Sequence, residues 1–106
     1  MNTESAKKWK SKRTTESRKI EKKLKELGYH QVDSYRYNSA SIRVRIIDDR
    51  FATGNRDKWE TIVEKDLVTL PEETRRDIVY LLLLAPSELA FSTLNAEFEN
   101  PSPSML

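Results

Sequence analysis

Apolar residues recur at helical spacing in residues 17–27. Ile20, Leu24 and Leu27 fall at positions i, i+4 and i+7, which places them on one face of a helix. Gly28 follows directly and is the residue type that most often ends a helix. Three lysines complement the dipole at the helix end: Lys22, Lys23 and Lys25. The pattern therefore predicts a first helix that ends at Gly28.

Two alternating segments follow and are rich in β-branched and aromatic residues. They are residues 31–38 (QVDSYRYN) and residues 41–47 (SIRVRII), joined by a short polar link. This arrangement predicts an antiparallel hairpin. In the second strand the three β-branched residues at even positions point one way, and Arg43 and Arg45 point the other way. We therefore expect one face of the hairpin to lie in the core and the arginine face to lie in water.

A second amphipathic helix follows the hairpin. Residues 52–55 form a turn, and the helix begins at Arg56 or Asp57 with Asn55 as its N-cap. Pro71 ends this helix and suits the first turn of another short one. The apolar stripe of the second helix comprises Trp59, Ile62, Val63, Leu67 and Leu70.

The apolar segment at residues 78–85 (IVYLLLLA) fits two kinds of structure. Its four leucines favour a helix, which could continue the one begun at Pro71. Its length, its Ile-Val-Tyr start and the following Pro86 favour a fully buried central strand. We favour the strand, beside the hairpin. Residues 86–88 then open a last helix.

The expected order is α-β-β-α-α-β-α, an α+β domain at residues 16–96 with a three-stranded sheet packed against helices. Residues 1–15 lack a helical apolar stripe, and Trp9 is their only large apolar side chain. This pattern predicts a flexible basic N-terminal arm, or a frayed extension of the helix, without a core residue. The proline-containing residues 97–106 are predicted to form a disordered C-terminal tail.

Composition excludes most catalytic chemistry. The chain has no cysteine, so it has no disulfide, thiolate nucleophile or cysteine-bound metal. His30 is the only histidine and lies in a GYHQ turn, which suggests an exposed loop side chain. Asp48 and Asp49 are adjacent in an extended segment, so their carboxylates point to opposite sides. We expect no catalytic residue, no cofactor and no metal site, and therefore no enzyme.

Charge is distributed unevenly along the chain. Residues 1–27 hold ten Lys and Arg against four Asp and Glu, a balance of +6. Residues 71–106 hold two basic and six acidic side chains, a balance of −4. No segment approaches the roughly 20 apolar residues that span a membrane, and the lysine-rich start does not look like a secretory signal. These features predict a soluble cytoplasmic protein that makes no membrane contact.

Several motifs resemble the BolA family, small proteins with a type II KH-like fold, between Ile20 and Leu89. These motifs are IEKKL in the first helix, VDSYRYN, IRVRIIDDRFATGNR and LLLLAPSEL. The family has a histidine just before its closing strand, which helps to hold a [2Fe–2S] cluster shared with a monothiol glutaredoxin. Asp77 stands at that position here, and YRYNSASI has no equivalent of the hairpin ligand. The resemblance thus implies the fold and a protein partner, and the departures predict that no cluster forms.

Two functions remain in view. The first is a non-enzymatic regulatory or adaptor protein of BolA-like fold that contacts an unidentified protein, with Asp77 marking the partner surface. The alternative is weak RNA or DNA binding by the basic arm and the arginine face, where Tyr35 or Tyr37 could stack a base. The candidate contacts are Lys7, Lys8, Lys10, Lys12, Arg13, Arg36, Arg43 and Arg45. The arginines could instead form an ordinary solvated face, paired with Asp33, Asp48 or Asp49.

Overall fold

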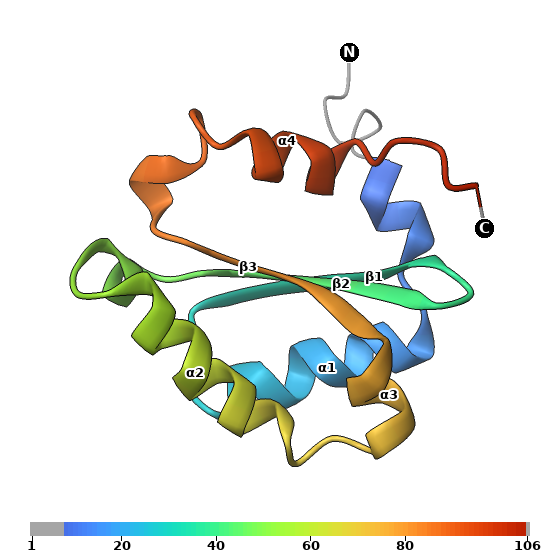
Figure 1. The fold of residues 1–106 in the computed structure, drawn as a ribbon, viewed down its shortest axis with the longest axis horizontal. Coiled ribbons are helices and arrows are strands. Elements are labelled where there is room, and N and C mark those ends of the chain that lie inside the picture. Colours follow the sequence, from blue (N-terminus) through green and yellow to red (C-terminus); the bar gives the residue numbers. More distant parts are fainter. Residues whose placement is uncertain (1–7, 106) are drawn as a thin grey trace.

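A three-stranded mixed sheet separates two layers of helices in the computed structural model, which describes residues 8–105 (Figure 1). Helices α1, α2 and α3 lie on one face of the sheet, and α4 lies across the other face together with the N-terminal turn η2. The elements are η2 (Lys8–Lys12), α1 (Thr15–Glu26), β1 (Gln31–Asn38), β2 (Ser41–Ile47), η3 (Asp49–Ala52), α2 (Arg56–Leu67), α3 (Glu72–Asp77), β3 (Ile78–Leu84), η4 (Pro86–Glu88) and α4 (Thr93–Glu99), where η denotes a short 3-10 helix.

The sheet has the order β1-β2-β3. Strands β1 and β2 form the predicted antiparallel hairpin, in which Val32 lies opposite Ile46, and β3 pairs with β2 in parallel. The predicted α+β architecture is thus confirmed, and so is a strand beside the hairpin at residues 78–84. The prediction that this strand is central and fully buried was wrong. β2 is the central strand, because β1 pairs with one of its edges and β3 with the other. β3 is therefore an edge strand, and its Val79 is 67% exposed.

Capping residues explain where the helices begin and end. The Thr14 hydroxyl accepts a hydrogen bond from the Ser17 amide at 3.0 Å, and Ser17 Oγ accepts one from the Thr14 amide at 2.9 Å. Gly28 follows α1 at φ +104°, a conformation that favours glycine. Asn55 caps α2 as predicted, because its side chain accepts a hydrogen bond from the Asp57 amide at 2.8 Å.

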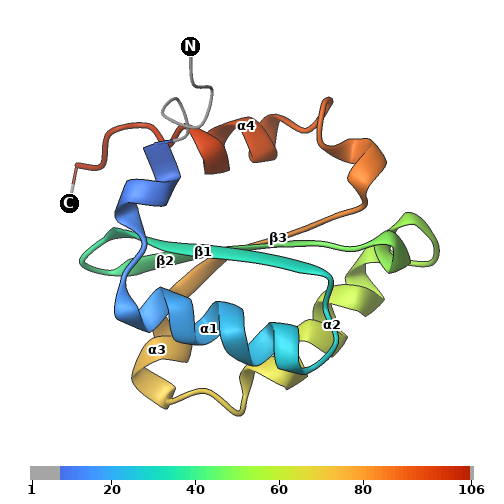
Figure 2. The ribbon, with the colours of Figure 1, turned by 180° about the vertical axis from the view of Figure 1, so that it is seen from behind.

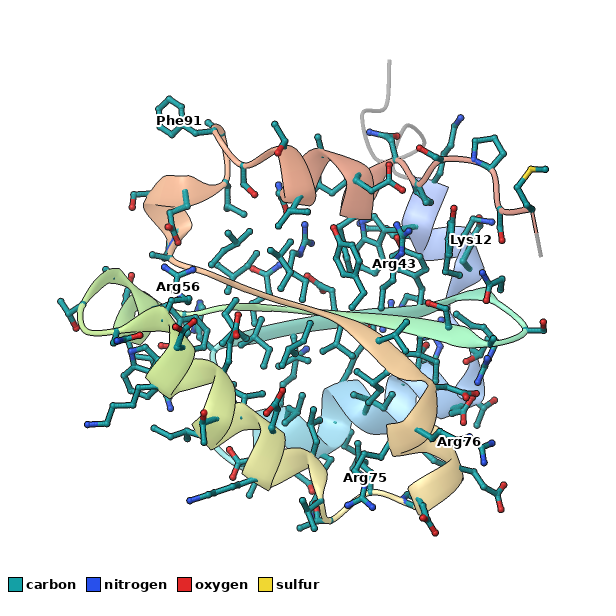
Figure 3. All side chains as sticks on the ribbon, viewed as in Figure 1. Lys12, Arg43, Arg56, Arg75, Arg76 and Phe91 are labelled. Atoms are coloured by element: carbon teal, nitrogen blue, oxygen red, sulfur yellow. The ribbon has the colours of Figure 1, made fainter. Side chains whose placement is uncertain are left out.

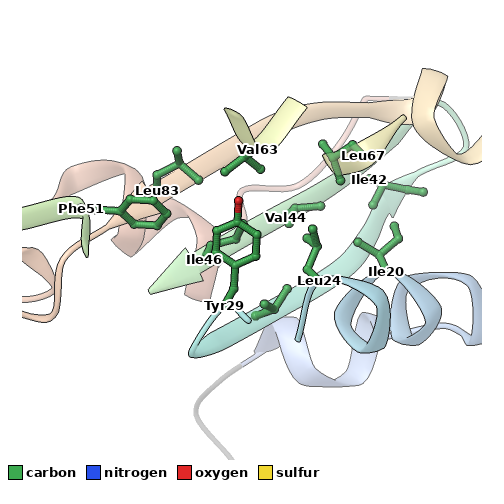
Figure 4. Packing of buried hydrophobic residues seen from close by; sticks show 11 residues of the cluster. Ile20, Leu24, Tyr29, Ile42, Val44, Ile46, Phe51, Val63, Leu67 and Leu83 are labelled. Atoms are coloured by element: carbon green, nitrogen blue, oxygen red, sulfur yellow. The ribbon is translucent and has the colours of Figure 1, made fainter. Parts of the chain in front are cut away.

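The first hydrophobic core lies between the sheet and helices α1 and α2 (Figure 4). Ile42, Val44 and Ile46 of β2 all point into it, as the alternation in the sequence predicts. Ile20 and Leu24 reach it from α1, as their helical spacing predicts. The remaining buried members are Tyr29, Val32, Phe51, Val63, Leu67 and Leu83.

A second core covers the opposite face of the sheet, where water was expected. Its buried hydrophobic members come from η2, the sheet and α4: Trp9, Tyr35, Leu82, Leu84 and Phe98. The Tyr35 and Phe98 ring centroids lie 4.9 Å apart, and the Tyr35 hydroxyl donates a 2.8 Å hydrogen bond to the Phe98 carbonyl. The prediction of a solvated arginine face was therefore wrong, since Arg43 and Arg45 are both buried beneath α4.

Both ends of the described chain differ from the sequence-based expectation. Lys8–Lys12 form a 3-10 turn, and Trp9 within it is only 3% exposed, so the expected arm does contain a core residue. Residues 1–7, with the candidate contact Lys7, lie outside the described residues.

At the other end, α4 extends into the predicted tail, because it runs to Glu99. Beyond it, the Tyr37 hydroxyl donates to the Ser102 carbonyl at 2.6 Å, and Asn38 Nδ2 donates to Ser104 Oγ at 2.9 Å. The last residues described thus lie against the hairpin. No helix among residues 8–105 is both long and apolar enough to cross a bilayer.

Candidate functional site

Arg43 is enclosed by aromatic rings and a carboxylate. Its guanidinium carbon lies 3.7 Å from the Tyr37 ring centroid and 4.6 Å from that of Tyr80. Its Nη1 donates to Glu97 Oε2 at 2.9 Å and to the Tyr35 hydroxyl at 3.3 Å. Burial raises the pKa of Tyr35 to about 12, although the hydrogen bond from Arg43 acts in the opposite direction. Arg43 therefore holds the second core together.

Arg45 is saturated with partners. Its side chain is 3% exposed, and its guanidinium donates to Asp33 at 2.7 Å, to Glu99 at 2.8 Å and to Asn95 at 2.7 Å. The guanidinium carbon also lies 4.6 Å from the Phe98 ring centroid. The pairing of a hairpin arginine with Asp33 was one of the alternatives raised by the sequence, and it occurs at Arg45. Because this charge is neutralised inside the molecule, it is not exposed to a phosphate backbone.

Arg36 joins three elements through carboxylates. Its Nη2 lies 2.8 Å from Glu16 of α1 and 2.9 Å from Asp77 at the end of α3. Thr74 donates a further hydrogen bond to Glu16 at 2.9 Å. The hydrogen bond from Arg36 holds the pKa of Glu16 below its ordinary value. Asp77, the residue at the family's ligand position, is thus bound within the domain, and Arg76 Nε lies 3.7 Å from its other oxygen.

The other candidate contacts lie near the start of the described chain. Arg13 pairs with Glu21, whose second oxygen accepts a 2.8 Å hydrogen bond from the Ser34 amide. The side chains of three lysines on η2 are exposed: Lys8, Lys10 and Lys12. The structure therefore separates the predicted nucleic-acid site into exposed lysines and arginines that are ion-paired or buried.

An apolar groove follows the free edge of β3. Its volume is about 470 Å³, and residues 81–84 of β3 line it together with Arg56 and Glu60 of α2. Phe91, in the segment between β3 and α4, also lines the groove and is 85% exposed. Leu94 of α4 lines it as well and is 56% exposed. Large exposed apolar side chains beside a groove are typical of binding surfaces. In Figure 3, Phe91 and Arg56 lie near the same end of β3, at the α4 side and the α2 side of the strand.

Arg56 and Glu88 fix the end of this edge. Arg56 Nη1 donates to the Leu83 carbonyl, and its Nη2 lies 3.0 Å from Glu88 Oε1. The Ala85 amide donates to the same Glu88 oxygen at 2.7 Å, which holds the pKa of Glu88 below its ordinary value. The Leu83 carbonyl points away from β2, toward Arg56. The backbone amide and carbonyl groups of a strand point to alternate sides from one residue to the next, so those of Leu81 also point away from β2. Leu81 is therefore open to a further strand.

Sequence reasoning did not identify this groove. Phe91 precedes Leu94 and Phe98 by three and seven residues, which is a helical spacing, and this apolar row was the signal available. Residues 8–105 contain no cluster of three or more His, Cys, Asp or Glu side chains that could hold a metal ion. Comparisons with protein-family models, curated proteins and solved structures found no match.

Proposed function

We propose that the chain is a non-enzymatic regulatory or adaptor protein that binds a partner protein at the groove along β3. The observation that carries this proposal is the combination of an unpaired strand edge with two exposed apolar side chains, Phe91 and Leu94. A BolA-like fold belongs to the same proposal. The order of helices and strands and the three-stranded sheet support it, because both are what the resemblance of the sequence motifs implies.

An extended segment of a partner suits this surface. Its backbone could pair with the outward amide and carbonyl of Leu81 and with the outward amide of Leu83. Its apolar side chains would then cover Phe91 and Leu94, and each covered side chain contributes about 1.5–3 kcal/mol. The Leu83 carbonyl is already bound by Arg56, which limits pairing to the part of the strand before it. The groove thus offers main-chain hydrogen bonds that contribute affinity, and apolar contacts that determine which partner sequence binds.

The carboxylates with shifted pKa values support a non-enzymatic role. Glu16, Glu88 and Glu97 all have lowered pKa values, because Arg36, the Ala85 amide and the Ser102 amide respectively donate hydrogen bonds to them. Each carboxylate is thus engaged in holding two elements together. Glu16 and Glu88 line hollows of the surface, but each is ion-paired there with an arginine, whereas acid–base catalysis requires a group that is free to exchange a proton with a substrate.

Affinity capture with variants of the groove tests the proposal. Immobilised chain would be incubated with extract of the source cell, with and without nuclease, and the captured proteins would be eluted and quantified. We expect a captured protein that survives nuclease treatment and is lost with Phe91→Ser. Val68→Ser is the matched control, because Val68 is 59% exposed but does not line the groove. Its capture should equal that of the unaltered chain.

Two outcomes would overturn the proposal. The first is capture that Phe91→Ser and Val68→Ser leave equally unchanged, because the groove would then not be the contact surface. The second is capture that nuclease abolishes, because the partner would then be held through nucleic acid. Far-UV circular dichroism of both variants should match the unaltered chain, since neither side chain is part of a core.

A further inference from the structure

The outward face of α1 carries a row of cations. Arg18, Lys22 and Lys25 have the spacing i, i+4, i+7, and each is exposed. This row is offset by two residues from the buried row that begins at Ile20, and two residues correspond to about 200° of helix rotation. The cations therefore lie on the side of α1 that faces away from the core. From first to last they span about 10 Å along the helix axis.

These cations have no acidic partner within the described residues. None of Arg18, Lys19, Lys22, Lys23 and Lys25 takes part in an ion pair there. Two acidic residues of α1 form ion pairs elsewhere: Glu16 pairs with Arg36, and Glu21 pairs with Arg13. Glu26 is the exposed acidic residue of this helix. The face consequently keeps a large positive charge.

The turn η2 carries further cations on the other side of the same sheet edge. Figure 2 shows η2 on the α4 side of the sheet, and the chain passes the edge strand β1 from there to the N-terminal end of α1. Lys8 and Lys12 are exposed on it, and Figure 3 labels Lys12 there. A shallow hollow of about 440 Å³ lies along the face of α1, lined by Arg13, Arg18, Glu21, Lys22, Lys25 and Glu26. The hollow gives the row of cations a concave shape.

We propose that this basic face binds the phosphodiester backbone of a nucleic acid. The contacting residues are Lys8, Lys12, Arg18, Lys22 and Lys25. Neighbouring cations of the row are about 5–6 Å apart at Cβ, which suits a backbone that carries one negative charge per nucleotide. Ammonium and guanidinium groups on an exposed helix contact phosphate rather than base edges, so binding is independent of sequence.

A lipid surface fits this face less well than a nucleic acid. Helices that lie on membranes present an apolar face to the acyl chains beside the basic one. The apolar face of α1 is already buried, because Ile20 and Leu24 belong to the first core. Leu27, at 44%, is the exposed large apolar residue next to α1. The surface thus offers charge without an apolar anchor.

The basic face and the groove lie at opposite edges of the sheet. Helix α1 packs against β1, whereas the groove follows β3. A nucleic acid and a partner protein could therefore be held at the same time without overlap. This inference goes beyond the proposed adaptor function, and either one can fail without the other.

Salt dependence of binding to a fluorescein-labelled single strand of about 20 nucleotides is the test. Neutralising about five phosphates predicts a slope near −3.5 for the logarithm of affinity against the logarithm of salt concentration. In R18Q/K22Q/K25Q we expect a slope that is flatter by about 2, and at 0.1 M salt about 100-fold weaker binding than the unaltered chain. The control K58Q/K65Q/R76Q removes three exposed cations outside the face, and its binding should change by less than threefold.

Four outcomes would overturn the inference. The first is no binding by the unaltered chain at about 20 mM salt, where screening is weak. The second is equal weakening in both triple variants, which would mean that net charge alone matters. The third is equal affinity for polyglutamate of matched charge, and the fourth is binding to phosphatidylserine vesicles in place of the nucleic acid. All substitutions are at exposed positions, so circular dichroism should show unchanged folding.

Discussion

Replacing Trp9 with alanine should destabilise the domain by about 2–3 kcal/mol. Truncating a buried tryptophan costs about 3–5 kcal/mol. Trp9 is 3% exposed and packs against Phe98 and Tyr35, with ring centroids at 5.6 and 6.2 Å. The buried indole N–H of Trp9 lacks a hydrogen-bond partner, and its removal relieves about 1–2 kcal/mol of that loss. The net loss corresponds to a fall in Tm of about 10–20 °C for a domain of this size.

Urea unfolding followed by circular dichroism measures the effect. Trp9→Phe keeps an aromatic ring and removes the unpaired N–H, so we expect a loss below about 1 kcal/mol. Lys12→Ala is the matched control, because Lys12 is exposed on the same turn, and its change should stay within about 0.5 kcal/mol. Iodide should quench Trp9 fluorescence poorly in a Trp59→Phe background, since the indole is buried.

A loss below about 0.5 kcal/mol for Trp9→Ala would refute this reasoning. It would mean that the Trp9 side chain is as exposed to water in the folded state as in the unfolded state. Ready quenching by iodide would lead to the same conclusion. The turn η2 would then be the flexible arm that the sequence pattern indicates. The second core would have to be closed by α4 alone.

Three further outcomes follow from other contacts. Arg45→Ala should cost about 3–5 kcal/mol in urea unfolding, because it leaves Asp33 and Glu99 without their buried partner; a cost below 1 kcal/mol would contradict this. Gly28→Ala should cost about 1–2 kcal/mol, since alanine is strained at φ +104°, and an unchanged urea midpoint would contradict it. The urea midpoint should fall as the pH drops below about 4.5, because Glu97 has a lowered pKa in the folded state. The stabilisation by the Glu97 carboxylate is present above its ordinary pKa of 4.5 and is lost as the pH falls through the folded-state pKa. Glu97→Gln should flatten that profile.

The sequence predicted the first core well because local periodicity specifies it. Alternation in SIRVRII placed Ile42, Val44 and Ile46 on one side of a strand, and helical spacing placed Ile20 and Leu24 on one side of a helix. Both patterns depend only on residues close together in the chain. The strand at residues 78–84 was decided in the same way, from its length and its β-branched start.

The second core could not be predicted from such patterns. Alternation tells which residues share a face of a strand, but not what covers that face. The cover comes from Phe98 of α4, which accepts its hydrogen bond from Tyr35 at a separation of 63 residues, and from Trp9 of η2. Trp9 stood alone in a polar segment, and the helical spacing of Leu94 and Phe98 predicts a helix but not the face of the sheet that this helix covers. An arginine in a strand, such as Arg45, is expected to face water from the local pattern alone. Its burial depends on carboxylates from distant parts of the chain, which that pattern does not show.

The two cations buried in the second core are arginines, whereas the proposed phosphate contacts are mostly lysines and include Arg18. The guanidinium is planar and weakly hydrated, so it can be buried against rings and carboxylates, as Arg43 and Arg45 are. The ammonium of lysine is strongly hydrated and stays at the surface, as at Lys22 and Lys25. The sequence contained this distinction, but the lysines of α1 were assigned to the helix dipole and the hairpin arginines to the ligand. Reversing the two assignments moves the expected phosphate contacts from the hairpin to α1.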